Sequence, residues 1–281
     1  MNDVGDGQGN GSKSISTGWA CLRWAAAGWW CDLRMAAGFL TLLPGARPGK
    51  AARQEAASNN GFLAGAAAMF PLVGAAVGVA AGAVLLFAHG LGLPPLVAAF
   101  VALAALVVLT GALHEDGLGD VADGFGGGRT PHDKLRIMRD SRVGTYGVVA
   151  VVFSLGLRAA AVAALPAVSG AAGIIAAAAL SRAMLPAILR WLPSARPTGM
   201  GAEAGRPRLR AVAAAAVIGV LVALIALGPV SGLLAAALAA IGAAAVALLA
   251  RRQIGGHTGD VCGAAQQTAE VAALLAVVAW R

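Results

Sequence analysis

Seven long apolar stretches constrain the fold of this chain more than any other feature. Each has close to the roughly 20 residues that an α-helix needs to cross the hydrocarbon core of a bilayer. They lie at about residues 61–88, 94–113, 146–165, 171–190, 208–228, 230–250 and 263–280. Only 12% of all residues are charged and 59% are hydrophobic, whereas soluble domains carry roughly 25% charge. The sequence therefore predicts an all-α fold, a polytopic transmembrane helical bundle with about seven spans.

The amino-terminal part differs from these spans. Residues 1–18 are mostly Gly, Ser, Asn and Asp, so we expect a disordered extension. Residues 19–43 are apolar but include Arg23, Asp32 and Arg34, and each such charge costs about 2.5–3.5 kcal/mol at the centre of a span. We therefore expect an amphipathic helix at the membrane interface. Residues 19–281 are predicted to form a single integral-membrane catalytic domain.

The connections between the predicted spans alternate in charge. Lys and Arg are absent from those at 89–93, 166–170 and 228–229. They are concentrated in and beside those at 114–145, 191–207 and 251–262. The positive-inside rule then predicts that the basic connections and the amino terminus face the cytoplasm. Because this bias and contact with membrane lipid account for the net charge of +8, no nucleic-acid partner is expected.

One segment concentrates the acidic residues. Of the 13 Asp and Glu residues in the chain, six lie between His114 and Tyr146. Asp116, Asp120 and Asp123 are spaced i, i+4, i+7, which places them on one face of a helix. Carboxylates in such a row suit Mg²⁺ or Mn²⁺, ions that commonly bridge protein carboxylates and substrate phosphates. A solvated acidic helix end is the alternative, but the scarcity of acid elsewhere favours a cation site.

Two further segments lie on the same predicted side of the membrane. Thr130 and Pro131 indicate the start of a short surface helix. Arg139 and Arg142 follow it and are three residues apart, so they could face one phosphate together; contact with lipid headgroups is the alternative. Residues 255–260 form a Gly-rich loop that ends in Asp260, suited to close approach by phosphate or metal. A flexible polar turn is the alternative for this loop.

Three ionisable residues fall inside predicted spans, where charges are rare and usually paired or functional. They are Arg158, Arg182 and Glu270. Arg182 and Glu270 have similar predicted depths, so we expect them to form a structural pair. Alternatively, Arg182 lines the floor of a substrate cavity. The sequence indicates no partner for Arg158.

These motifs resemble the adenosylcobinamide-GDP ribazoletransferase family, also called cobalamin synthase. The resemblance rests mainly on residues 114–127 and 137–147, and residues 70–74, 181–182, 255–260 and Glu270 extend it. It implies a membrane transferase, dependent on Mg²⁺ or possibly Mn²⁺, that joins adenosylcobinamide-GDP to α-ribazole or α-ribazole 5′-phosphate and releases GMP. Assembly as a homo-oligomer, or with other corrinoid-assembly enzymes, stays open.

The resemblance and the chemistry of the side chains together suggest a role for each candidate residue. The predicted metal ligands are Glu115, Asp116, Asp120, Asp123 and Asp260. The predicted contacts to substrate phosphate are Arg139, Arg142, Arg182, Gly256 and His257. The predicted catalytic residues are His114, Glu115 and Asp120, with His114 or one carboxylate as the general base.

Two other classes of protein share part of this pattern. Another metal-dependent membrane transferase, of the CDP-alcohol or prenyl type, would also place carboxylates at cytoplasmic helix ends, but its sequence motifs are missing here. A cation or solute transporter would place its acids near the middle of the membrane, at broken helices. The clustering at one predicted span end argues for chemistry at the membrane surface.

Overall fold

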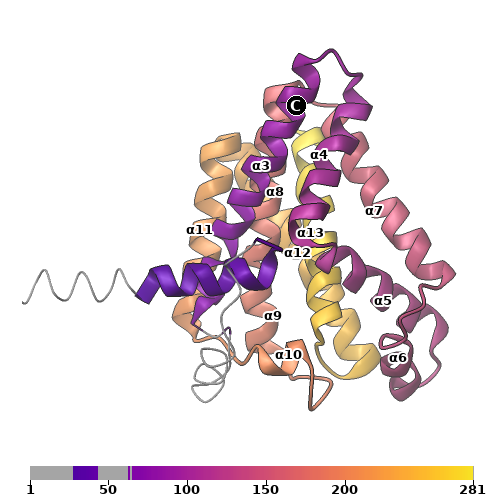
Figure 1. Cartoon of the computed structure of the whole chain (residues 1–281). Helices are drawn as coiled ribbons and strands as arrows, with labels where there is room; N and C mark the ends of the chain where they lie inside the picture. The colour runs from indigo at the N-terminus through magenta and orange to yellow at the C-terminus, as the bar shows by residue number, and fades with distance from the viewer. Residues whose placement is uncertain (1–27, 44–62, 64, 281) are drawn as a thin grey trace, which may run out of the picture.

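The computed structural model describes residues 28–43, 63 and 65–280, and every regular element there is a helix (Figure 1). A helix at residues 28–40 comes first. It is followed by η1 (Ala66–Met69), α3 (Phe70–Gly90), α4 (Pro95–Thr110), α5 (Leu113–Gly127), α6 (Pro131–Ile137), α7 (Thr145–Ala163), α8 (Ala167–Ala183), α9 (Leu185–Trp191), α10 (Met200–Glu203), α11 (Leu209–Leu227), α12 (Pro229–Ile254) and α13 (Gly259–Ala279).

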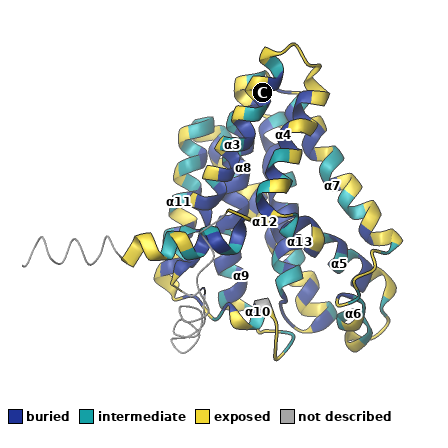
Figure 2. Ribbon diagram, viewed as in Figure 1, coloured by how far each residue is buried: buried dark blue, intermediate teal, exposed yellow. Residues whose placement is uncertain are grey.

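The predicted class, a polytopic helical bundle, is confirmed. Six segments of the described chain are long and apolar enough to cross a membrane: Ala66–Gly90, Thr145–Ala163, Ala167–Trp191, Leu209–Leu227, Pro229–Ile254 and Gly259–Ala279. The pair α4 and α5 would make a seventh if both helices are taken as one broken span. Buried residues face the interior of the bundle, and exposed residues cover the outward sides of α7 and α11 (Figure 2).

The predicted span at 94–113 corresponds to α4, which is shorter than predicted. α4 has 16 residues and ends at Thr110, and α5 leaves it at an angle of 90°. The break occurs because Gly111 and Ala112 both adopt left-handed backbone conformations, with φ of 65° and 56°, and such a residue ends a helix. The acidic helix α5 therefore starts inside the bundle rather than at the end of a span.

Small residues let the central helices approach closely, as expected for a bundle in lipid. Between α3 and α8, a Cβ added at Gly74 would lie 2.2 Å from the carbonyl oxygen of Ala178 and 2.7 Å from Cδ of Arg182. This contact explains the glycine in the 70–74 motif, since any side chain there would push α8 and Arg182 away.

The helix at 28–40 is too short to cross a membrane and lies across the bundle instead (Figure 1). Ala36 and Leu40 are buried, whereas Trp29 and Trp30 are exposed, as expected for a helix at the interface. Phe39 stacks on Phe70 of α3 with ring centroids 6.1 Å apart. The predicted extension at 1–18 and the rest of the amphipathic segment lie outside the described residues.

The basic connections lie at one end of the bundle, where Figure 1 shows α6 and α10, and the α3–α4 turn lies at the other end. α6 begins where the sequence predicts. Thr130 accepts a hydrogen bond from the backbone of Asp133, whose carboxylate accepts one from the backbone of Thr130, so the helix has a complete capping box.

Candidate active site

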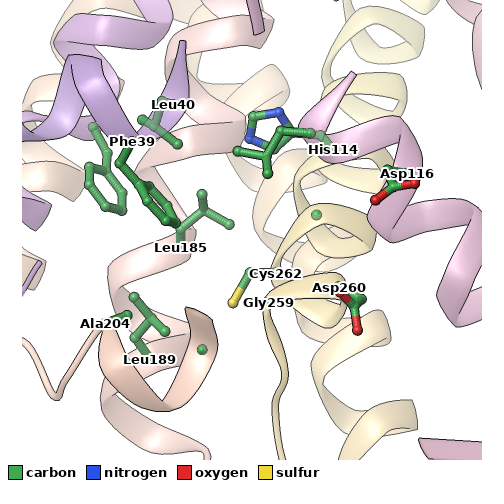
Figure 3. A pocket seen from close by; sticks show the side chains of 14 residues that line it. Phe39, Leu40, His114, Asp116, Leu185, Leu189, Ala204, Gly259, Asp260 and Cys262 are labelled. Carbon is green, nitrogen blue, oxygen red and sulfur yellow. The ribbon is translucent and has the colours of Figure 1, made fainter. Parts of the chain in front are cut away.

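Close contact between α5 and α13 brings three carboxylates together. A Cβ added at Gly117 of α5 would lie 2.8 Å from the carbonyl oxygen of Asp260 in the first turn of α13. Asp116 and Asp260 consequently lie opposite each other (Figure 3). Asp120, one turn further along α5, is near enough to interact with both charges and with Arg196. We call Asp116, Asp120 and Asp260 the acidic cluster.

Asp123 was predicted as a metal ligand, but the structure gives it another role. Its two carboxylate oxygens accept hydrogen bonds from the backbone N–H groups of Gly144 (2.7 Å) and Gly147 (2.8 Å). Those groups are free donors at the amino terminus of α7, where a negative charge is favourable. A Cβ at either glycine would lie within about 2.5 Å of the carboxylate. Asp123 therefore anchors α7 to α5.

Glu115 also differs from its predicted role as a metal ligand. Its Oε1 accepts a hydrogen bond from Nη2 of Arg158 (3.0 Å), while Nη1 of Arg158 donates to Glu270 Oε1 (2.9 Å). Arg182 Nη1 donates to Glu270 Oε2 (2.8 Å). The expected pair of Arg182 and Glu270 is thus confirmed, and Arg158 gains the partners that the sequence did not indicate. We call these two Glu and two Arg residues the buried ion network.

The buried ion network is electrically neutral and hydrogen-bonded on several sides. Charges this deep in a protein need partners, and each of the four has an ionic one, although Oε2 of Glu115 and Nε and Nη2 of Arg182 have no hydrogen-bond partner among the described residues. The additional partners are Ser154, Ser181, Gln266 and Gln267, contributed by α7, α8 and α13. Sequence reasoning missed the two glutamines, although polar residues inside an apolar span signal a buried polar site.

His114 lies at the start of α5 and is only 2% exposed. Neither ring nitrogen has a hydrogen-bond partner among the described residues, and the same holds for Nε and Nη2 of Arg182. The charges of Arg182, Glu270 and Arg158 all act on His114, which places it beside the buried ion network. Buried polar atoms without partners are rare in native proteins and point to a ligand or water at the site.

A small cavity of about 50 Å³ lies beside the acidic cluster. One wall is apolar, with side chains from the helix at 28–40, α3 and α9: Phe39, Leu40, Phe70, Leu185 and Leu189. The opposite wall carries His114 and Asp116 of α5 and Asp260 and Cys262 of α13 (Figure 3). We call this cavity the inner chamber.

The loop at 255–260 is built into the structure rather than freely flexible. The backbone N–H of His257 donates to Pro193 O and the N–H of Ala195 donates to His257 O, both at 2.8 Å. A Cβ at Gly256 would lie 2.2 Å from Pro193 O. Burial lowers the pKa of His257, so its imidazole is neutral near pH 7 and any contact with phosphate would be a hydrogen bond.

The structure separates the two arginines predicted to bind phosphate together. Arg142 points into solvent and pairs with Asp140 at 2.8 Å, and its hydrogen bonds lower the pKa of Asp140 to about 2. Arg139 lies near Arg196, a residue that sequence reasoning did not select. Arg196 lies 3.5 Å from Asp260 and donates to Leu135 O. In the sequence, Arg196 is one of several basic residues in and beside the connection at 191–207, and nothing there singles it out.

Comparison with known proteins now decides the family. The family model described as cobalamin-5-phosphate synthase matches residues 32–278. The chain belongs to this family. A relative from Bradyrhizobium diazoefficiens is 47% identical over 89% of this chain and 94% of its own length. One from Azorhizobium caulinodans is 51% identical over 74% of this chain and 81% of its own. Both are named adenosylcobinamide-GDP ribazoletransferase, and no solved structure matches the chain.

Membership of the cobalamin-5-phosphate synthase family makes the protein a transferase of cobalamin biosynthesis, acting in assembly of the nucleotide loop. The alternatives of a CDP-alcohol phosphotransferase and of a transporter are thereby set aside. The match also covers every part of the site described above: α5, the 137–147 segment, the buried ion network and the 255–260 loop.

The side chains of this member of the cobalamin-5-phosphate synthase family fit one mode of Mg²⁺ binding. Among the described residues, no three His, Cys, Asp or Glu side chains are grouped closely enough to hold a metal by themselves. Mg²⁺, however, is commonly held by only one or two carboxylates together with substrate phosphates and water. The acidic cluster provides carboxylates of that kind beside a cavity, so it fits an ion that arrives with a phosphate substrate.

Proposed function

We propose that the protein joins adenosylcobinamide-GDP to α-ribazole or α-ribazole 5′-phosphate, releases GMP, and depends on Mg²⁺, with Mn²⁺ as a substitute. The observation that carries this proposal is the meeting of His114, Asp116 and Asp260 at one cavity. Phosphoryl transfer depends mainly on positioning and on neutralising the charge of the phosphates, and this cavity combines carboxylates, an unpartnered imidazole and a nearby arginine.

In the proposed reaction, the acceptor hydroxyl attacks the phosphate attached to the cobinamide. A new P–O bond forms, the bridging P–O bond to GMP breaks, and GMP leaves with the electron pair. The proton of the hydroxyl passes to His114, whose ring nitrogens have no other partner among the described residues. One or two carboxylates of the acidic cluster would hold Mg²⁺ together with substrate phosphate, and the ion would neutralise the pyrophosphate charge. Arg196 and Arg139 are placed to contact phosphate oxygens.

The direct test uses the purified protein in lipid nanodiscs with adenosylcobinamide-GDP, α-ribazole and Mg²⁺. We expect equal amounts of GMP and adenosylcobalamin, and activity that disappears with a chelator and returns with added Mg²⁺ or Mn²⁺. Parallel reactions with either substrate alone are the control. Folded protein that releases no GMP with both substrates present would contradict the proposal.

We further propose that the basic end of the bundle, with the active site, faces the cytoplasm of the bacterial cell. The exposed residues His132 of α6 and Leu91 of the α3–α4 turn lie at opposite ends. In protein whose native cysteines are replaced by serine, an impermeant maleimide should label Leu91→Cys from the periplasm and His132→Cys only after lysis. The reverse pattern would contradict this orientation. Association with a second copy or with other corrinoid-assembly enzymes stays a prediction.

A further inference from the structure

Another, larger cavity lies beside the inner chamber, where residues 192–206 pack against the 255–260 loop at the end of the bundle that carries α10 (Figure 1). It holds about 370 Å³, which falls within the range of roughly 300–1,000 Å³ for sites that take a small molecule. We call it the outer cavity. The aromatic and polar side chains in its lining are those of Trp191, Ser194, Arg206 and His257.

The inner wall of the outer cavity is firmly held and contains a buried imidazole without a partner. Ser194 and His257 form a parallel backbone bridge, and a Cβ added at Gly201 would lie 2.8 Å from the backbone nitrogen of Gly259. His257 is only 4% exposed, and its Nδ1 has no hydrogen-bond partner among the described residues. Such an atom is rare in a native protein, so it points to a ligand in the cavity that it lines.

A smaller cavity of about 130 Å³ adjoins both the outer cavity and the acidic cluster. It shares Ser194, Gly201 and Ala202 with the outer cavity, and its lining also includes Arg196 and Asp260. Nε of Arg196 is buried without a partner among the described residues, and its Nη1 lies 3.5 Å from Asp260. We call it the connecting cavity. A space for a flat ring system thus leads to a cation and a carboxylate, which is the order of groups that a nucleotide with its metal ion needs.

The side chains of the outer cavity fit a guanine base. Trp191 is 60% exposed, so its indole offers a face on which a base can stack. Nε of Arg206 donates to the carbonyl oxygen of Arg190 at 2.8 Å, which orients the guanidinium, and its terminal nitrogens have no partner among the described residues. An arginine with two free N–H groups recognises O6 and N7 of guanine together. The benzimidazole base of α-ribazole carries no oxygen that could accept in this way.

We propose that the outer cavity binds the guanosine of adenosylcobinamide-GDP, with the guanine against Trp191 and Arg206. The phosphates follow the connecting cavity toward Arg196 and Asp260, and a ribose hydroxyl supplies the missing partner of His257. This inference rests on the proposed function, and it adds which part of the protein holds the leaving group. The P–O bond that breaks then lies beside the acidic cluster, and GMP leaves through the outer cavity.

The first experiment measures binding of GMP without turnover. The full-length protein in phosphatidylcholine nanodiscs is titrated with GMP and Mg²⁺, and tryptophan fluorescence is recorded. We expect a saturable change that Trp191→Phe loses and Trp280→Phe keeps. Trp280 is the matched control because it is 57% exposed and lies at the other end of the bundle (Figure 1).

Two results of this titration would overturn the inference. One is the absence of a saturable change with GMP, or a change that Trp191→Phe retains. The other is a change at Trp191 that phosphatidylglycerol in the nanodisc produces and GMP does not, because the outer cavity would then hold a lipid headgroup.

The second experiment tests the recognition of the base. AMP lacks the O6 atom of guanine, so we expect half-maximal binding of AMP at a concentration about tenfold higher than that of GMP. Arg206→Met should remove this preference, whereas Arg210→Met, an exposed arginine in the first turn of α11, should keep it. Equal binding of AMP and GMP by the wild type, or an unchanged preference in Arg206→Met, would exclude the assigned role of Arg206 and overturn the inference.

The third experiment separates the inference from the proposed function. Trp191→Ala should raise KM for adenosylcobinamide-GDP and Ki for GMP about tenfold, with KM for α-ribazole unchanged, and Trp280→Ala should change none of these constants. A rise in KM for α-ribazole instead would place the acceptor in the outer cavity and overturn the inference while GMP release continues. Wild-type protein that releases no GMP from the two substrates would overturn the proposed function, whereas the binding titration reports on the outer cavity alone.

Discussion

At the scale of single residues, the four carboxylates of α5 differ in what their oxygens contact. Glu115 pairs with Arg158, and Asp123 accepts two backbone N–H groups of α7. Asp116 and Asp120 instead belong to the acidic cluster with Asp260. Similar residues in one short helix therefore differ in their surroundings: Glu115 and Asp123 bind groups of other helices, and Asp116 and Asp120 lie near Asp260.

Asp120→Asn tests the role of the acidic cluster. The substitution keeps the shape of the side chain but removes its charge, so we expect kcat to fall about 100-fold or more while the protein still inserts and folds. GMP release and thermal unfolding in detergent are the measurements. Asp133→Asn, on the exposed cap of α6, is the matched control and should keep normal activity. Normal turnover by Asp120→Asn would exclude it as a metal ligand.

Asp123→Ala tests the anchoring role assigned to Asp123. Loss of a helix cap costs about 0.5–2 kcal/mol, so we expect a lower free energy of unfolding. Asp123→Asn keeps one acceptor oxygen and should lose less. In both variants, the Mg²⁺ concentration that gives half-maximal activity should stay as in the wild type. A large rise in that concentration would instead support Asp123 as a metal ligand.

At the scale of elements, the break between α4 and α5 positions the site. A continuous helix through residues 95–127 would place His114 and the acidic residues along one axis and outside the bundle. The left-handed pair of Gly111 and Ala112 turns α5 by 90°, so that His114 and Glu115 point toward α7, α8 and α13. Left-handed backbone at an alanine is strained, and such strain is often found at functional sites.

Substitutions at the two residues of the break should have opposite effects. A Cβ at Gly111 would lie 2.8 Å from Leu42, at a positive φ, and a non-glycine residue in this region costs roughly 1–2 kcal/mol. We therefore expect Gly111→Ala to lower both Tm and kcat, because it shifts α5 and His114. Ala112→Gly relieves the strain and should keep or slightly raise Tm. Equal tolerance of both changes would show that the turn is not constrained.

At the scale of the whole molecule, the buried ion network connects four helices far apart in the sequence. Glu115, Arg158, Arg182 and Glu270 come from α5, α7, α8 and α13, respectively. Because each charge has a partner only when all four helices are in place, the network favours one arrangement of the bundle. It also fixes the start of α5, next to His114.

Arg158→Met should destabilise the whole bundle. Glu115 and Glu270 would each lose a partner, and removing one member of a buried ion pair costs about 3–5 kcal/mol. Glu270 keeps its pair with Arg182, so Glu115 is left as the unpaired charge. Adding Glu115→Gln to this variant removes that charge, and we expect Tm to recover part of the loss. Thermal unfolding of the single and double variants in detergent is the measurement. A double variant less stable than Arg158→Met would contradict the pairing.

Much of this protein follows from its sequence because the signals are local. The length and apolarity of the spans determined a helical membrane bundle, and Thr130 with Pro131 indicated the start of α6. The basic connections indicated which spans end on the same side of the bundle. The motifs at 114–127 and 137–147 carried the family resemblance. These properties depend on residues close together in the chain, which the periodicity of a helix relates directly.

Only the tertiary structure decided which distant side chains meet. The depth and rotation at which each helix packs decide these contacts. They determine the partners of Arg158, the capping of α7 by Asp123, the approach of Arg196 to Asp260 and the inner chamber. A shift of one residue turns a helical side chain by about 100°, enough to point it away from its partner. Sequence spacing therefore placed the acidic residues on one helix, and packing assigned their separate roles.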